Sequence, residues 1–438
     1  MAILPQKSLF DWTDIDLLGD LHRLRLVLDH LPDETLMVCL EDQRGNGRDD
    51  YPVRAMWNSV VAGVVFQHPS IQTLRRELSR NAQLLTLCGF DPLRSTARVP
   101  PPWAYTRFLK TLIKQNALIE EIFKTLVGQL SHLLPSFGST LAIDGKAIDS
   151  HGNPPKSDKL EHPDGRRDLD ADWGVKSYSG VSEDGSLWKK VKSWFGYRIH
   201  LVVDADYELP VAFNVTKAST SEVKQAHQLV DQIDLDHGDL LKGCDTFLAD
   251  RGYDDGKLIN KCWRDHQIKP VIDIRNLWKD KQETRLIEHT ENIVYDFQGT
   301  VSCVCLQSGD VKQMAYAGFE KDRNTLKYRC PARHYGVECK GQATCGVSTA
   351  IRIPLATDSR IFTPCARSSY SWKTLYNKRS SVERVNSRLA GSYGFETHFT
   401  RGLEKMKLKM GVALCTMLAM AVGRIKEKQY ENMRRLVA

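Results

Sequence analysis

The sequence predicts an α/β protein with an all-α region at its N-terminus. Apolar residues recur at three- and four-residue steps up to about Gly89, and β-type runs begin at Ser139. A later stretch has short apolar runs and gathers five of the 11 cysteines. We therefore expect a helical region, then a mixed sheet interrupted by a Cys-rich, mainly β insertion. A chain of 438 residues is long enough for two or three domains.

The composition is that of an ordinary globular protein, with 42% apolar and 26% charged residues. Sixty-one Lys and Arg against 54 Asp and Glu give a net charge of +7, which suits a polyanionic partner. The N-terminus lacks the pattern of a signal peptide, and the longest C-terminal apolar run, Val412 to Val422, is too short to span a membrane. An odd number of cysteines favours reduced thiols or metal ligands. We expect a cytoplasmic protein.

The first region, residues 1–98, is predicted to be helical, with helices from Asp16 onward. Ser70 is a suitable N-cap for a basic helix that follows a short turn. That helix carries Arg75, Arg76 and Arg80. A helix, a turn and a basic helix can read DNA, although a packing or dimerisation domain is the commoner use of such helices.

The remaining boundaries follow from composition and periodicity. A proline-rich linker and a helix from Tyr105 to about Leu134 fill residues 99–138. Residues 139–274 predict three strands, a helix, a strand, a helix and a strand, which is the layout of an RNase H-like domain. Residues 275–369 are the predicted insertion. Residues 370–438 return to the catalytic domain and end in a helix from Leu403 to about Met433 that packs against the sheet.

Three acids sit where such a sheet would bring them together. Asp144 is predicted to end one strand, Asp250 ends the strand Phe247 to Ala249, and Glu383 lies in the helix after the insertion. Phosphodiester chemistry uses carboxylates of this kind to hold two divalent ions, Mg²⁺ or Mn²⁺. Each aspartate alone is equally well explained as a turn former or helix cap.

One helix strengthens the case for a site. Tyr376, Arg379, Glu383 and Asn386 are three, four and three residues apart, so they project from one face. Facing a metal and a phosphate, each polar group has a partner: Glu383 the cation, Arg379 a phosphate, and Tyr376 the DNA backbone. The alternative is that this face of the helix is exposed to solvent and its charged side chains form ion pairs with one another.

These residues resemble a known family. The Y-x2-R-x3-E spacing at Tyr376, Arg379 and Glu383, with LAIDGKAI and FLADRGYDD upstream, is similar to the DDE transposases of bacterial insertion sequences. The resemblance covers most of the chain. It implies an RNase H-like fold, an insertion before the Glu, and Mg²⁺-dependent cleavage at element ends with strand transfer into a target. By the same resemblance, Asp144, Asp250 and Glu383 are the three acids.

The sequence departs from the family pattern at one position. The family often has a Lys seven residues after the Glu, where this chain has Ala390. Arg384 or Arg388 is the candidate replacement for that phosphate contact. Asp204 and Asp206 are rival acids, but they fall at a predicted hairpin turn, where turn chemistry explains them.

Further residues are candidates for DNA contact. The stretch from Trp188 to His200 interleaves lysines with aromatic residues, as a loop that holds DNA requires. The alternative is that this stretch is only a basic segment that precedes an ordinary strand. Its candidate contacts are Lys190, Lys192 and Trp194, and Lys146 is another. The expected partners are the terminal inverted repeats and target DNA, bound by a homodimer because two ends require two active sites.

The insertion offers a second metal hypothesis. Cys330, His334, Cys339 and Cys345 are thiolate and imidazole ligands that would suit a structural Zn²⁺. Their spacing is irregular and lacks a CxxC pair, so a small domain with reduced core cysteines is the alternative.

The sequence therefore predicts a DNA transposase. Two alternatives stay open: an RNase H-like nuclease that cuts without joining, and a domesticated DNA-binding derivative without enzymatic activity.

Overall fold

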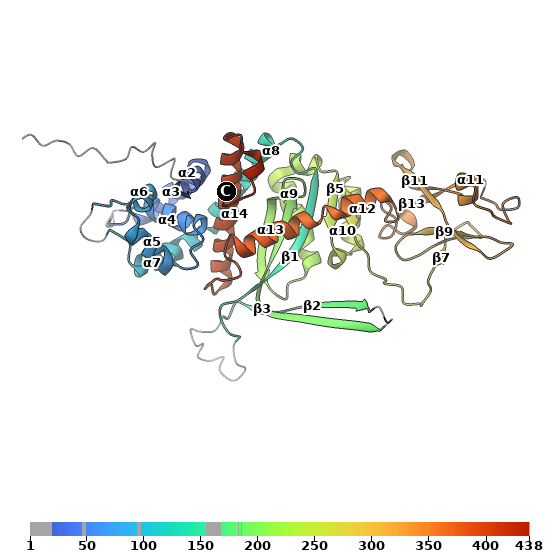
Figure 1. The fold of residues 1–438 in the computed structure, drawn as a ribbon, viewed down its shortest axis with the longest axis horizontal. Coiled ribbons are helices and arrows are strands. Elements are labelled where there is room, and N and C mark those ends of the chain that lie inside the picture. Colours follow the sequence, from blue (N-terminus) through green and yellow to red (C-terminus); the bar gives the residue numbers. More distant parts are fainter. Residues whose placement is uncertain are drawn as a thin grey trace, which may run out of the picture.

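The computed structural model describes residues 20–45, 50–93, 98–154, 168–182, 184, 186–347 and 349–437. The helix expected from Asp16 lies partly outside this range. The described chain is elongated, with a helical bundle at one end, a large sheet in the middle and two small sheets at the other end (Figure 1). Helices and strands both contribute, so the predicted mixed α/β class is confirmed.

The N-terminal part is built from short amphipathic helices. These are α2 (Asp20–His30), α3 (Glu34–Arg44), α4 (Val53–Val65), α5 (Ile71–Arg80), α6 (Ala82–Cys88), α7 (Pro102–Ile113) and α8 (Asn116–Leu133). Ser70 caps α5 as predicted, because its side chain accepts a hydrogen bond from the backbone N–H of Thr73. The single helix expected from Tyr105 to Leu134 is wrong. It divides at Lys114 and Gln115 because α7 contacts α5 whereas α8 packs along the C-terminal helix.

The central sheet has six strands among the described residues. They are β1 (Thr140–Asp149), β2 (Asp172–Val181), β3 (Leu187–Asp204), β4 (Leu209–Lys217), β5 (Thr246–Ala249) and β6 (Lys269–Ile272). The core runs β4-β3-β1-β5-β6, with antiparallel pairing from β4 to β1 and parallel pairing from β1 to β6. The turn between β3 and β4 is built around Asp204, which accepts the backbone N–H groups of Asp206 and Tyr207. Turn chemistry thus explains Asp204, as predicted.

Two expectations about these strands are wrong. Asp144 does not end its strand, because β1 continues to Asp149 and pairs with β3 over its whole length. The stretch from Trp188 is not a loop, because it forms the outer half of β3 and pairs with β2 from Asp172 to Val181. The β2–β3 pair, which we call the ribbon (Asp172–Val181 with Leu187–Gly196), projects beneath the sheet in Figure 1.

Helices cover the sheet and connect it to the N-terminal bundle. They are α9 (Glu222–Lys242), α10 (Gly256–Asn260), α12 (Tyr370–Asn377), α13 (Ser380–Gly391) and α14 (Leu403–Lys426). The last helix stops at Lys426, short of the expected Met433, and lies between the bundle and the sheet (Figure 1). Within the described residues α14 alone is long and apolar enough to cross a membrane, and 94% of that apolar window is buried. It packs on α8, α2 and β4, as a core helix does.

The insertion forms two small sheets with a separate core. One contains β7 (Arg285–Leu286), β8 (Ile293–Tyr295), β9 (Val301–Val304) and β10 (Val311–Gln313), and the other contains β11 (Ala315–Glu320), β12 (Thr325–Arg329) and β13 (Ala350–Pro354). A short helix, α11 (Pro331–Tyr335), follows β12. Buried side chains between the sheets, including Ile293, Tyr328 and Phe362, make a cluster distinct from the main core.

Candidate functional site

Two of the predicted acids come from adjacent strands of the central sheet. Asp144 lies in β1 opposite Leu201 of β3, and Asp250 directly follows β5, the parallel neighbour of β1. Asp250 accepts a hydrogen bond of 2.7 Å from the backbone N–H of Gly252, which fixes its carboxylate at the start of a tight turn. Burial raises the pKa of Asp144 to about 6, with Asp250 adding to the rise and Lys176 opposing it. The two carboxylates therefore share one electrostatic environment.

The third acid is carried to the same place by α13, which packs on β1 and β3. Glu383 and Asn386 line a cavity of about 370 Å³ together with Asp144. Asn386 Nδ2 donates to Asp144 Oδ2 at 3.2 Å. Glu383 instead pairs with Arg379 at 2.7 Å. Among the described residues, no three His, Cys, Asp or Glu side chains are arranged to hold a metal ion, so the acids are gathered on one side without being in coordinating positions.

The helix that carries Glu383 differs from its prediction. The single helix expected to carry Tyr376, Arg379 and Glu383 divides between α12 and α13, with tight turns at Lys378 and Arg379. The division lets α12 lie on β5 and β6 while α13 crosses β1 and β3. Burial raises the pKa of Tyr376, and the Arg379 guanidinium lies 5.6 Å from its ring centre. Tyr376, Arg379 and Glu383 thus form one connected group.

A fourth carboxylate, Glu222, was not anticipated. A Cβ atom added to Gly145 would lie 2.7 Å from Glu222 Oε1, and one added to Gly252 would lie 3.1 Å from Glu222 Oε2. Because these glycines are close in sequence to Asp144 and Asp250, Glu222 lies between the two aspartates. It is the first residue of α9, behind the N-cap Ser221, so sequence alone explains it as a helix-capping acid.

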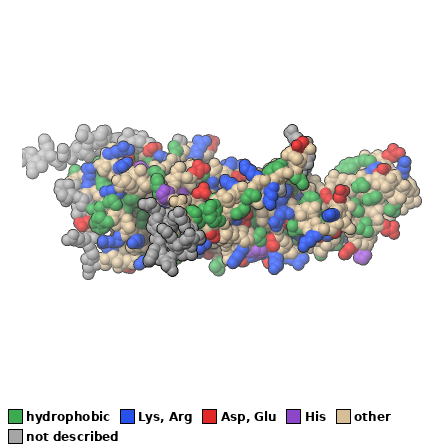
Figure 2. All heavy atoms as spheres, turned by 90° about the horizontal axis from the view of Figure 1, so that it is seen from below, with side chains coloured by type: hydrophobic (Ala, Val, Ile, Leu, Met, Phe, Trp, Pro, Cys, Tyr) green, Lys and Arg blue, Asp and Glu red, His purple; other side chains and the backbone are tan. Residues whose placement is uncertain are grey.

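Cationic side chains surround the acids. Lys146, Lys176, Lys192 and Arg198 line the cavity. Lys176 Nζ is 4.0 Å from Asp250 Oδ2, and Arg198 pairs with Glu222 at 3.3 Å. Figure 2, which views the face from below, shows Lys and Arg side chains over its middle part. Lys146 and Lys192 were predicted contacts. Arg198 lies within the basic stretch from Trp188 to His200 but was not predicted as a contact, and Lys176 lies outside every predicted motif.

A comparison with known families decides the assignment. A family model described as "Transposase DDE domain" matches residues 135–419, which is 285 of the 438 residues. The chain belongs to the DDE transposase family. The predicted resemblance is therefore confirmed, and the matched range includes all three acids predicted for the transposase site.

The other comparisons add little to the assignment of this transposase. No curated protein matches the chain. A cryo-electron-microscopy structure of a piggyBac transposase synaptic complex with hairpin DNA is similar at 10% identity and a TM-score of 0.40. The likeness covers 96% of this chain and 79% of that one, and it is too weak to bear on function.

Three residues proposed for DNA contact lie in unexpected surroundings. Trp194 is only 6% exposed and donates its indole N–H to the Tyr197 carbonyl, so its ring is not a free stacking surface. Arg384 and Arg388 both pair with Glu208, on a different surface from the cavity that holds Asp144. This placement argues against either arginine replacing the missing Lys, because the cavity-facing side of α13 carries Glu383, Asn386, Ser387 and Ala390 instead.

The remaining predicted residues of the transposase are distributed as follows. Lys190 lies exposed on the ribbon. Arg76 and Arg80 are exposed on α5, whereas Arg75 donates to the Pro100 carbonyl at 2.7 Å and so ties α5 to the linker. Cys330, Cys339 and Cys345 line one cavity in the insertion, but His334 does not. His334 therefore does not belong to the group of thiols with which it was predicted.

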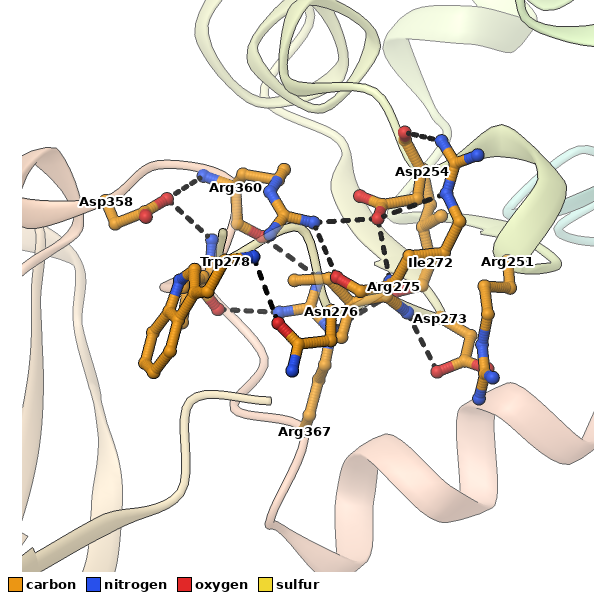
Figure 3. A network of polar contacts seen from close by, with 12 residues as sticks. Arg251, Asp254, Ile272, Asp273, Arg275, Asn276, Trp278, Asp358, Arg360 and Arg367 are labelled. Atoms are coloured by element: carbon orange, nitrogen blue, oxygen red, sulfur yellow. Dashed lines mark hydrogen bonds and ion pairs between the residues drawn. The ribbon is translucent and has the colours of Figure 1, made fainter. Parts of the chain in front are cut away.

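The loop that carries Asp250 is fastened to the insertion (Figure 3). Asp254 is fully buried and accepts a hydrogen bond of 2.7 Å from Arg360, near the end of the insertion. It also accepts the backbone N–H of Arg275, at the start of the insertion, at 2.8 Å. Arg367 is buried beside them and donates to the Ile272 and Ile361 carbonyls. Both ends of the insertion are thus tied to the segment that follows the second acid.

Proposed function

We propose that this transposase cleaves DNA at the ends of its element and transfers the freed strands into a target. The observation that carries the proposal is a cavity with cationic walls that is lined by Asp144 and Glu383, with Asp250 next to Asp144 at the end of the neighbouring strand. Acids on β1, directly after β5 and on a helix packed against β1 are suited to phosphodiester chemistry, because carboxylates can hold divalent ions while cations hold the phosphates.

The sheet supports an RNase H-like core for this proposal. Its order β4-β3-β1-β5-β6 joins three antiparallel strands to two parallel ones, with α9 between β4 and β5. We propose residues 139–274 and 370–438 as this catalytic domain, with 275–369 as its insertion. Residues 1–98 are proposed as the helical domain for repeat recognition or dimerisation, and 99–138 as the linker and helix.

The residues of the cavity fit a divalent cation of the Mg²⁺ or Mn²⁺ type. Asp144 and Glu383 in the cavity and Asp250 beside Asp144 offer hard oxygen ligands, and Asn386 Oδ1 is buried without a hydrogen-bond partner among the described residues. When bound, two such ions activate the attacking hydroxyl and stabilise the leaving oxygen. Glu383 would have to exchange Arg379 for the cation, which would release the guanidinium to bind a phosphate.

The cationic residues around the acids would position the DNA backbone. Lys176 and Lys192 are directly opposite each other in the β2–β3 register. Both lysines also line the cavity that holds Asp144, where they could contact a DNA phosphate. We propose DNA ends and target DNA as the partners, a homodimer as the active form, and the bacterial nucleoid in the cytoplasm as its place.

The central test replaces one acidic side chain with an uncharged side chain of the same shape. Asp144→Asn should lower the rate of strand cleavage by at least about 100-fold, because the site loses a metal-binding charge. The substrate is a duplex carrying the inverted repeats that flank the gene, with Mg²⁺ present. Asp149→Asn, at an exposed position of the same strand, is the matched control and should cleave normally.

Three outcomes distinguish the alternatives. Unchanged cleavage by Asp144→Asn would refute the assigned site. Cleavage by the unmodified protein without joining to a target duplex would favour an RNase H-like nuclease. Binding of the repeats without any cleavage would favour a domesticated DNA-binding derivative.

A further inference from the structure

Five cysteines of the insertion surround one small cavity. They come from β9 and the residue after it, from the end of β12, and from the segment that follows α11; they are Cys303, Cys305, Cys330, Cys339 and Cys345. The cavity has a volume of about 20 Å³, which is room for one water-sized occupant. A space of this size with thiol walls is too small for an organic ligand and suits a single metal ion.

The spacing of two sulfur atoms fits metal ligation better than a disulfide. Cys305 Sγ and Cys339 Sγ are 4.0 Å apart. Sulfur ligands of a tetrahedral zinc ion, each at about 2.3 Å, lie roughly 3.8 Å from one another. A disulfide requires about 2.05 Å, and every described cysteine is free. No three thiols yet surround a common point in the described residues, so binding would draw the segment 339–345 inward.

The backbone of that segment is already close to β9. A Cβ atom added to Gly341 would lie only 3.1 Å from Cys305 Sγ, so the glycine allows the segment to wrap around this sulfur. Lys312 and Arg333 also line the cavity. Four thiolates around Zn²⁺ carry a net charge of −2, which these cations would offset.

Hydrogen bonding indicates which four thiols are available. Cys303 Sγ donates to the Lys312 carbonyl at 3.5 Å, so this sulfur is already engaged with the backbone of β10. His334 lies outside the cavity, where its ring packs on Tyr335 and its Nδ1 is 3.5 Å from Arg329 Nη1. Removing these two leaves Cys305 and the three cysteines that follow it.

We propose that Cys305, Cys330, Cys339 and Cys345 bind one structural Zn²⁺. The ion would replace the thiol protons, which pass to solvent, and would fasten the segment after α11 to β9. The insertion needs such a fastening because its strands are short and its core is small. The site is separate from the carboxylates and does not depend on the proposed DNA chemistry.

The test is the zinc content of the full chain, purified from zinc-supplemented culture and measured by elemental mass spectrometry. We expect one zinc per chain, falling to near zero in Cys305→Ser and Cys339→Ser. Cys303→Ser, inside the same cavity, and Cys39→Ser, in α3, are the matched controls and should keep the ion. Asp144→Asn should also keep it, which excludes zinc held by the carboxylates.

A spectroscopic measurement does not depend on whether the variants fold. Replacing zinc with Co²⁺ in the unmodified chain should give the absorption bands of tetrahedral sulfur coordination. Three results would overturn the proposal: a zinc content near zero in the unmodified chain, a cobalt spectrum without sulfur ligation, or full zinc retention by Cys305→Ser. Detection of a Cys305–Cys339 disulfide in the protein as purified would overturn it as well.

Discussion

Glu222 adds negative charge between two acids that already repel each other. Its carboxylate reaches toward both Asp144 and Asp250, and the salt bridge with Arg198 is what neutralises it. Crowded carboxylates are costly in the free protein, but they raise the affinity for a divalent ion. A role in supporting the metal-binding acids therefore follows from its position.

We expect Glu222→Gln to raise the Mg²⁺ concentration for half-maximal cleavage by about 10-fold, because the amide keeps the shape but loses the charge. A Mg²⁺ titration of cleavage measures this. Glu288→Gln, an exposed position in the insertion, is the control. An unchanged Mg²⁺ requirement in Glu222→Gln would show that Glu222 only holds Arg198 in position and does not contribute to metal binding.

At the scale of elements, the ribbon is the most exposed cationic structure near the acids. Lys190 and Lys192 are two residues apart in β3, so they project from the same face. Two such charges each neutralise one phosphate and release its counterion on binding.

The double variant Lys190→Ala and Lys192→Ala should weaken DNA binding and reduce the slope of log affinity against log salt by about 1 to 2. Fluorescence anisotropy over a salt series measures both quantities. Lys242→Ala with Lys426→Ala removes the same charge at two helix ends away from the ribbon and should leave the slope unchanged. Equal slopes for both double variants would show that the ribbon does not contact DNA.

The C-terminal helix depends on a close approach to its neighbours. A Cβ atom on Gly423 of α14 would lie 2.5 Å from Leu26 Cγ of α2, and both residues are buried. Gly423→Ala should therefore lower the free energy of unfolding by about 1–3 kcal/mol through overpacking. Gly128→Ala in α8 meets nothing within 4 Å and should be neutral or stabilising by up to about 1 kcal/mol. Urea unfolding compares them, and equal stabilities would contradict this packing.

At the scale of the whole molecule, buried ion pairs connect the insertion to the central sheet. Asp254 has a fully buried side chain, and Arg360 is one of its ion-pair partners (Figure 3). Removing a partner from a buried ion pair leaves an uncompensated charge, whereas a surface pair contributes little.

We expect Arg360→Met to lower the free energy of unfolding by about 2–3 kcal/mol, because Arg275 still compensates part of the charge. It should also speed proteolysis between the sheet and the insertion. Arg352→Met, which breaks the more exposed pair with Glu320, should cost less than about 1 kcal/mol. Limited proteolysis and urea unfolding test both, and equal costs would mean that the junction is held by other contacts.

The sequence by itself determined the order of elements and the acids to examine. Short continuous apolar runs marked β1, β5 and β6, and a capping residue marked α5, because these signals are local. The family resemblance rested on short motifs around Asp144, Asp250 and Glu383, and the family match includes all three.

Tertiary structure alone decided which side chains share a space. Glu222 and Lys176 reach the acids because α9 begins there and β2 passes beside them, and a single residue in an ordinary helix or strand carries no sequence signal for such a meeting. The same holds for Arg384 and Arg388, whose partner Glu208 is more than 170 positions earlier in the sequence. Local periodicity fixes helices and strands, but contacts between distant segments depend on how the whole chain packs.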